Sequence, residues 1–500
     1  MAIETEAEII GIAKELHATH LRELEELDVL RRYVTGKQAM PLVIPRDAPR
    51  EVSEMARISR INIIGIVVNA LVESLFVDNL RAVDAGTDDA DVPELTPEQI
   101  AAAGEPESDA EHAVSEIWRV WQSNKLDRGQ SGLYRAVFTY GWAYMVVTAG
   151  TPSPVVRPVS LRSITALYGD DPDWPVYALE KRKRGRWTLY DETHAYTLGR
   201  DDKGEFSVIG EAEHGLTYTP VIRYVDAEDL DLDDEPDFSP APYARGVQSS
   251  IVAGQVAPLM TLQDQADVTT FGLRAAEWYT AFRQRWIVGW TPETRAAKVA
   301  AGASQMWTFD ADPDEVKLGE FAETTLDGYL RSRDATARFA ATLSQTPVHE
   351  LIGELVNLSA EALAAAEAGR DRKVDLRKTG NGESHEQMAG AVGDLLGLDV
   401  PDDIEVVWRD TSARAFGAIV DGLGKLAQML GVPPEALWER IPGATRQEIK
   451  RWKQLAEQGD SMASLTRLLD QQAGGGTPPT GAPGERTTES GLILPPGARV

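Results

Sequence analysis

The feature that most constrains the fold is a pair of long segments with the periodicity of an amphipathic helix. A shorter segment without helical periodicity separates them. From Val256 to about Phe282, apolar and small residues recur in steps of three and four, and Pro258 suits a first helical turn. Such a helix would be roughly 36 Å long at 1.5 Å per residue. A second pattern covers residues 323–343, and the residues between them, 288–322, include two short runs typical of strands, Met306–Phe309 and Glu315–Leu318. The packed faces are predicted at Leu259, Leu262, Ala266, Thr269, Leu273 and Ala276, and at Leu326, Leu330, Ala337 and Ala340.

The residues before these helices change once from a helical pattern to a β-strand pattern. Residues 4–33 predict one or two amphipathic helices, and the block 52–80, rich in Ile and Val, predicts a buried helix. Helical residues resume at 111–124 and again after Ser131. Short runs of β-forming residues separated by turn clusters then predict a β-rich unit over 143–225. At least part of the acidic segment 83–117 is predicted to be a solvated loop, treated as an insertion, and the acidic segment 226–237 is predicted to be a second such loop.

The chain after the second long helix is again mainly helical. Thr346–Pro347 resembles a helix N-cap followed by proline, with a short turn to Gly353. An alanine-rich helix is predicted from Ser359 to about Lys378, with a break at residues 380–382 and a restart at Ser384. Residues 404–408 predict a strand, and residues 411–470 predict three helices. The Gly- and Pro-rich residues 471–500 predict a flexible tail.

Composition excludes several classes of protein. At 500 residues the chain predicts several packed units, and 79 acidic against 50 basic residues give a formal net charge of −29. That charge disfavours tight, static binding of nucleic acid through its phosphates. The absence of cysteine excludes disulfides, thiolate nucleophiles and Cys-dependent zinc sites, and fits a reducing cytoplasm. The N-terminus does not resemble a secretory signal, and the longest apolar run, Ile63–Val77, is too short to span a bilayer.

No motif predicts catalysis, a cofactor or a metal. Walker A, dinucleotide-binding, serine-elbow and His-based zinc patterns are absent from the sequence. Asp229, Asp231 and Asp233 mimic the start of a calcium loop, but Asp234 and Pro240 stand where Gly and Glu are required. A solvated acidic loop is therefore favoured over adventitious cation binding. The twelve tryptophans are scattered, which favours packing and subunit contacts over base stacking.

A series of short motifs, each weak alone, occurs in a recognisable order. The most specific lies in Ser249–Gly289, where a helix carrying Leu262–Gln263–Asp264 ends in the aromatic-Arg-Gln-Arg run before Gly289. The others are Tyr33 with Gly36, Asn62, Trp121–Asn124, Tyr140–Tyr144, Thr346–Pro347, Leu358–Leu363, Trp408–Asp410 and Ile441–Gly443. Over about residues 20–455 this order resembles the portal proteins of tailed double-stranded-DNA bacteriophages, of the actinobacteriophage type.

The resemblance implies an α+β, mainly helical fold divided into wing, stem, clip and crown. It places the wing at 1–244 (helical 1–142, β-rich 143–225, acidic loop 226–237) and at 358–410. It places the stem at 245–287 and 323–345, the clip at 288–322, the crown at 411–470 and the tail at 471–500. Residues 346–357 would form the loop that projects into the tunnel, with Thr346, Pro347, Val348, His349 and Glu350 at its start.

The function implied is that of a non-enzymatic ring subunit through which DNA enters and leaves the capsid. Expected partners are further copies in a ring of usually twelve, double-stranded DNA, the terminase large subunit, a head–tail adaptor, and the major capsid and scaffolding proteins. We expect no membrane association and no cofactor, a place at the capsid vertex of the virion, and the host cytoplasm during assembly. Two alternatives remain: another virion structural protein, such as a minor head or connector component, and a carboxylate-dependent hydrolase or nuclease.

Overall fold

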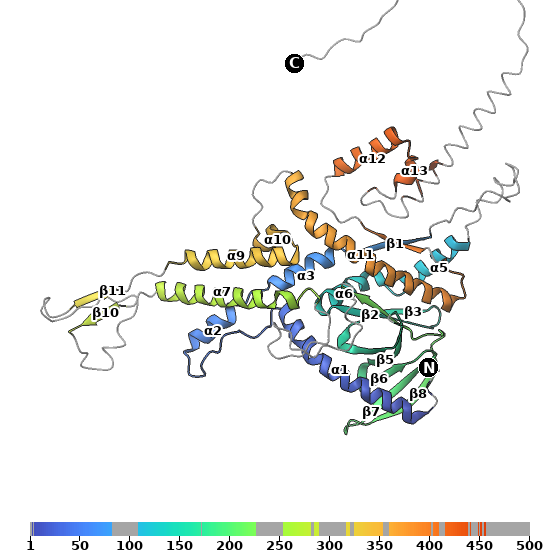
Figure 1. Cartoon of the computed structure of the whole chain (residues 1–500), viewed down its shortest axis with the longest axis horizontal. Helices are drawn as coiled ribbons and strands as arrows, with labels where there is room; N and C mark the ends of the chain where they lie inside the picture. The colour runs from blue at the N-terminus through green and yellow to red at the C-terminus, as the bar shows by residue number, and fades with distance from the viewer. Residues whose placement is uncertain are drawn as a thin grey trace, which may run out of the picture. The chain divides into compact units, whose positions relative to one another are not determined.

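The structure is a computed structural model (Figure 1) that describes residues 3, 5–82, 109–171, 173–226, 254–281, 285–289, 317–320, 325–353, 360–401, 404–409 and 416–438, with 441, 449, 451–452 and 455–456. Most of the two acidic segments, the strand expected at 306–309, much of the third crown helix and the tail lie outside the described residues. The chain divides into two compact units, Met1–Ala413 and Arg414–Val500. Within the described residues the fold is α+β and mainly helical, as predicted.

The N-terminal residues form three helices and a strand. Helix α1, Glu6–Val34, begins with a capping box in which the Thr5 and Glu8 side chains each bond to the other's backbone N–H. Helices α2, Arg50–Ile58, and α3, Ile63–Glu73, follow, and then strand β1, Val77–Ala82. The helical block predicted over 52–80 is present as α2 and α3, and Asn62 starts the second of them by accepting a 2.8 Å bond from the Gly65 N–H. Its predicted end was wrong, because the residues from Val77 form β1.

Helices α2 and α3 together carry enough apolar character to cross a membrane by length and composition alone. The span is Arg50–Glu73, with a mean hydropathy of 1.5 and 56% of its most apolar window buried in the chain. It is divided at residues 59–62, and Ile64, Val67 and Val68 in α3 are fully buried. These residues belong to the protein core, which accounts for their apolar character.

The β-rich unit predicted over 143–225 is present as two antiparallel sheets. Helices α5, Asp109–Ser123, and α6, Leu126–Tyr140, lead into β2, Trp142–Thr148, which pairs with β3, Val155–Val159, and β9, Val221–Val225. The second sheet is a five-stranded meander. Its strands are β4, Ile164–Tyr168; β5, Pro175–Lys181; β6, Arg186–Tyr190; β7, His194–Arg200; and β8, Phe206–Glu213. Strand β4 was not predicted.

Two cores hold the first unit together. The larger joins α3, α5, α6, the three-stranded sheet, the start of the first long helix and the C-terminal part of α11, Ala360–Leu396. The smaller lies between the N-terminal half of α1 and the five-stranded sheet, where Ile9 and Leu16 pack with Trp187 and Phe206. Helix α1 therefore spans both cores and ties the sheet unit to the helical unit (Figure 1).

The two long helices predicted from the sequence are α7, Met260–Ala281, and α9, Asp327–Ser344. They lie side by side, and the hairpin of β10, Arg285–Val288, and β11, Lys317–Glu320, lies at their far end (Figure 1). The hairpin thus begins at Arg285, inside the segment 245–287 that was assigned to the first stem region. Helix α10, Val348–Ile352, follows α9 after a short turn.

Helix α11, Ala360–Leu396, is one uninterrupted helix of 37 residues. The break predicted at residues 380–382 was wrong. A side chain added at Gly380 would meet nothing within 4 Å, so this glycine marks no turn. Asn381 is fully buried, and its Nδ2 donates to the Arg377 carbonyl at 2.8 Å within the helix and to the Val225 carbonyl at 3.4 Å in β9. Asn381 therefore connects the helix to the sheet.

Strand β12, Ile404–Trp408, forms where it was predicted and pairs antiparallel with β1, from Ala82 opposite Ile404 to Val77 opposite Trp408. This pairing joins two segments that are far apart in sequence. The second unit, described by itself, contains α12, Phe416–Leu430, and α13, Pro434–Leu437.

Candidate functional site

The two long helices approach each other closely because their facing residues are small. Helix α9 buries Ala337, Ala340 and Ala341, whereas α7 brings Gly272 so close to Tyr329 that a Cβ there would lie 2.7 Å from the ring. At 1.5 Å per residue, the 22 residues of α7 give a rod about 33 Å long. The pair therefore forms a rigid arm that carries the hairpin β10–β11 at its end.

The motif residues noted in the sequence meet at the base of this arm. Gln263 in α7 accepts a 2.9 Å hydrogen bond from the Ile63 N–H, at the start of α3, and donates to the Ile61 carbonyl at 2.7 Å. Asp267, one turn later, accepts from the Ile61 N–H at 3.0 Å and from Gln38 Nε2 at 2.7 Å. Two side chains of α7 thus satisfy backbone groups of the segment that starts α3 and the side chain of Gln38.

Further motif residues surround the same junction. Tyr33 at the end of α1 donates to Asp264 Oδ1 at 2.8 Å, and Asn62 donates to the Val34 carbonyl at 2.9 Å. Gly36 has a φ of +67° and lies against the Asn62 side chain. Residues separated by more than 200 positions therefore form one polar connection between α1, α3 and α7.

Because its side chains are buried, this polar connection favours one position of α7 relative to α3. Gln38 and Asp267 are fully buried and Gln263 is 1% exposed. Burial raises the pKa of the Asp267 carboxyl above its ordinary value. A buried polar group is costly unless it is bonded, so any displacement of α7 along α3 would leave several groups unsatisfied. Sequence reasoning missed Gln38 and Asp267, although the spacing of Gln263 and Asp267 on a packed helix face was a usable signal.

A second buried polar cluster, also at the base of the arm, joins both of its helices to α11 and to Asp226 after β9. Lys373 in α11 donates to the Ser344 carbonyl, at the end of α9, at 2.9 Å and also contacts Gln255 Oε1, just before α7. Gln255 Nε2 in turn donates to Asp226 at 2.5 Å, and Arg377 bonds to the same carboxylate at 3.2 Å.

Desolvation lowers the pKa of Lys373 to about 8. Asp226 is buried in this cluster, so the predicted solvated loop over 226–237 does not include its first residue. The arm is therefore fixed to the body of the first unit at two separate polar sites.

Helix α10 contains most of the residues predicted to begin the tunnel loop. Thr346 is buried, and its N–H donates to the Ala341 carbonyl at 3.0 Å, which ends α9. Pro347 occupies the cap position of α10, and Gly353 ends the helix with a φ of +77°. Residues 354–357 lie outside the described residues. The segment is thus a short helix held at its start by the end of α9.

His349 and Glu350 of α10 meet Glu367 of α11, and one ligand atom from each lies within 4.8 Å of the others. Such a trio could bind a cation, but Arg370 already forms ion pairs with Glu350 and, at 3.4 Å, with Glu367. The Arg370 side chain is only 12% exposed, so a metal that took both carboxylates would leave this guanidinium with Asp371, at 3.7 Å, in place of its two buried partners. The geometry favours an arginine-held cluster that fastens α10 to α11.

The predicted packing residues of the arm divide into buried and exposed groups. Leu259, Ala266 and Leu273 are buried, and Leu262 is partly buried against the larger core. Leu326 caps α9 and is partly buried. Leu330 is 38% exposed in the single chain, where alanines of α9 are buried instead, so its predicted role in stem packing stays a prediction.

Large apolar side chains on α9 lie on the face away from α7. Phe339 is 66% exposed and Leu343, one turn later, is 55% exposed, whereas the alanines of the same helix are buried. This is the reverse of the pattern expected for a helix on the surface of a monomer, where the larger apolar residues face the core.

Comparison with known proteins gives a consistent result. The sequence matches the family described as phage portal protein, SPP1 Gp6-like, over residues 13–462. It is 26% identical over 386 residues to the portal protein of Mycobacterium phage D29, covering 71% of this chain and 76% of that protein. It is 25% identical over 423 residues to the portal protein of Mycobacterium phage L5, covering 77% and 82%.

Among solved structures, chains of gene transfer agent particles match this chain. A chain in the virion of a native particle matches with a TM-score of 0.45 and 13% identity, covering 81% of this chain and 99% of that chain. A chain in the neck of a native particle, computed with C12 symmetry, matches with a TM-score of 0.40 and 14% identity, covering 79% and 92%.

Proposed function

The chain belongs to the SPP1 Gp6-like family of phage portal proteins, and we propose that it acts as one subunit of a ring whose central channel passes double-stranded DNA. The family is structural, and its members are components of the virion. In this proposal α7 and α9 form the stem, the hairpin β10–β11 belongs to the clip, and α10 begins the tunnel loop. The sheets and α11 form the wing, and the second unit belongs to the crown.

The observation that carries the ring proposal is the outward apolar face of α9. Phe339 and Leu343 are each more than half exposed in the single chain. Exposed large apolar residues on adjacent turns of one helix mark a surface that another protein covers. In a ring of identical subunits the neighbouring copy covers it, and the contact is heterologous because each subunit offers a different face to each neighbour.

The charge of the chain supports a channel that does not hold its DNA. Each subunit carries a formal net charge of −29, and a ring would multiply this value. Phosphate contacts from Lys and Arg would strengthen binding and resist movement of the polymer. An acidic assembly instead repels the DNA, which suits a polymer that must slide in both directions.

A single substitution in α9 tests the ring contact. We expect Phe339→Asp to leave a folded subunit that no longer closes into rings, because a carboxylate would have to be buried between subunits. Ile209→Asp is the matched control, since Ile209 is 56% exposed on β8, away from the arm. Native mass spectrometry should show rings for the wild type and the control and subunits for Phe339→Asp. Rings of Phe339→Asp that match the wild type would remove the support that α9 gives to the proposal.

The tunnel segment is tested by replacing Val348–Ile352 with a Gly-Ser linker while Thr346 and Pro347 are kept. Thr346 bonds to the last turn of α9 and Pro347 follows it at the cap of α10, so their retention separates channel function from stability of the stem. We expect rings to form and DNA packaging or retention to fall. Normal packaging by such rings would show that α10 has no role in the tunnel.

Partners follow from the same proposal. The clip would dock the terminase large subunit during packaging and a head–tail adaptor afterwards, and the wing would contact the major capsid and scaffolding proteins. Assembly of such a ring would take place in the host cytoplasm, before the ring becomes part of the capsid vertex. Twelve copies is the ring size that we propose.

A further inference from the structure

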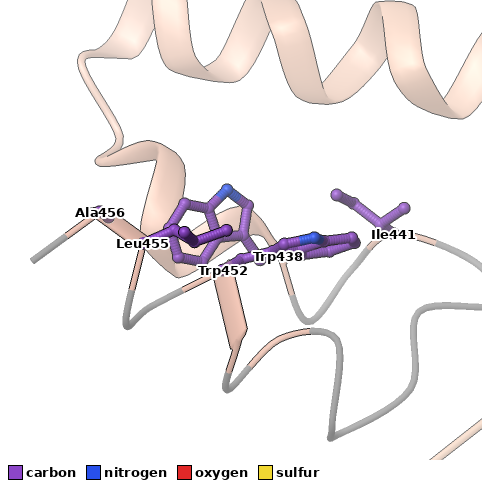
Figure 2. A pocket seen from close by; sticks show the side chains of 5 residues that line it. All are labelled: Trp438, Ile441, Trp452, Leu455 and Ala456. Carbon is purple, nitrogen blue, oxygen red and sulfur yellow. The ribbon is translucent and has the colours of Figure 1, made fainter. Parts of the chain in front are cut away.

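The second unit contains an apolar groove that no part of the proposed channel function uses. It is lined by Trp438, Ile441, Trp452, Leu455 and Ala456 and has a cavity volume of about 520 Å³. The two indoles meet edge to face, with ring centroids 6.3 Å apart and planes inclined by 73°. Figure 2 shows them side by side, with Leu455 on one side and Ile441 on the other. The lining consists wholly of aromatic and aliphatic side chains.

The chain itself carries a segment of matching chemistry. Residues 457–500 follow directly after Ala456, which lines the groove. From residue 471 to 491 the sequence has no Leu, Ile, Val, Met or aromatic residue, and then Leu492–Ile493–Leu494–Pro495–Pro496 occurs. A tail that served only as a solvated spacer would need no such run, because Gly, Pro and polar residues suffice for that role.

We propose that the groove between Trp438 and Trp452 binds the segment 492–496 of the same chain. Two consecutive prolines favour the extended polyproline II conformation, and Leu494 before them is restricted to extended backbone. Grooves lined by aromatic rings bind such segments because the ordering cost is already low and the flat rings of proline pack on indole faces. The leucine and isoleucine side chains add apolar area against Ile441 and Leu455.

The distance along the chain allows this contact within one subunit. Leu492 lies 36 positions after Ala456, and a flexible linker of that length has a root-mean-square end-to-end distance of about 33 Å. Tethering gives an effective concentration on the order of millimolar. Even a weak intrinsic affinity, with a Kd of about 0.1 mM, would keep the segment bound most of the time. The tail also carries balanced charge, Glu485 and Glu489 against Arg486 and Arg499, so it is not repelled by the acidic chain.

Hydrogen–deuterium exchange on the full-length protein tests the proposal. We expect the amides of Leu492–Leu494 to exchange about tenfold more slowly than those of Thr487–Ser490 in the same tail. Trp452→Ala should abolish this difference. Equal exchange in the two segments, or protection that survives Trp452→Ala, would overturn the assignment.

A substitution in the tail tests the proposal without changing a residue of the groove, so misfolding of the groove would not explain its effect. Leu494→Asp leaves the second unit untouched, and we expect it to raise exchange in the groove segments around Trp438 and Trp452. Thr480→Asp, in the proline-containing part of the tail that the proposal leaves free, is the matched control and should change neither region. Unchanged exchange in the groove of Leu494→Asp would contradict docking of this segment.

Mixed assemblies separate binding within a subunit from binding between subunits. Chains carrying Trp452→Ala have an intact tail, whereas chains carrying Leu494→Asp have an intact groove. In co-assembled mixtures the proposal predicts no protection of Leu492–Leu494 in the Trp452→Ala chains. Partial restoration of that protection would show that the tail reaches a neighbouring copy and would overturn binding within one chain.

Discussion

At the scale of single residues, Gln263 is the side chain that connects the arm to the rest of the first unit. Its amide both accepts from the N-terminus of α3 and donates to the preceding turn. We predict that Gln263→Leu lowers the free energy of unfolding by about 2–4 kcal/mol, because the Ile63 N–H and Asp267 lose a buried partner. Gln265→Leu, two positions later and exposed, should change it by less than about 0.5 kcal/mol. Urea unfolding of the subunits measures both, and equal effects would show that the connection contributes little.

Glu23 in α1 gives a prediction about pH. It accepts a 2.7 Å hydrogen bond from Thr165, and burial raises its pKa from 4.5 to about 7. The folded state therefore holds the proton more tightly, so the stability that Glu23 provides is complete below about pH 4.5 and is lost as the pH rises through about 7. Glu23→Gln removes this loss and keeps an acceptor for Thr165.

We therefore expect Glu23→Gln to raise the free energy of unfolding by roughly 1–3 kcal/mol at pH 8 and to change it little at pH 5. Unfolding curves at the two pH values provide the measurement. Exposed Glu25→Gln is the control and should behave as the wild type at both. A stabilisation of equal size at both pH values would mean that charge on Glu23 is not its cause.

At the scale of elements, the uninterrupted helix α11 shows where reasoning from sequence failed. Glycine usually weakens or ends a helix, but Gly380 lies inside α11 with open space around it. Gly380→Ala should thus raise the melting temperature, from a gain of about 0.5–1 kcal/mol in helix propensity. Gly397→Ala should lower it, because Gly397 ends the helix region with a φ of +67°. Scanning calorimetry measures both melting temperatures. A lower melting temperature for Gly380→Ala would support the predicted break in the helix.

Other elements were predictable where the hydrophobic periodicity of a segment and the turn-forming residues at its ends agree. Strands β3, β9 and β12 form at the predicted residues because alternating or β-branched runs are bounded by turns. The helical pattern that begins at Val256 predicted α7 because the same face stays apolar over six turns. The pattern over 52–80 misled because α3 and β1 are both rich in apolar residues, and composition alone does not separate a buried helix from a strand.

The candidate site was less predictable than the elements that carry it. Tyr33, Gly36, Asn62 and Gln263 could be selected singly, but their meeting at one junction depends on how α1, α3 and α7 pack. Lys373 and Gln255 carried no local signal, because a buried polar group is recognisable only once its partners are placed. The outward position of Phe339 likewise follows from close packing of alanines, which the helical period does not distinguish from packing of larger residues.

At the scale of the whole molecule, the central claim is that this chain closes into a ring around a channel. The rigid arm, the outward apolar face of α9 and the strongly acidic composition each have a use in such an assembly and little use in an isolated subunit.

Electron microscopy of the purified protein at micromolar concentration tests this claim most directly. A ring-forming subunit should give axial views of closed rings with an open centre. A monodisperse 54.6 kDa subunit at low and at high salt, with no ring in any view, would contradict it.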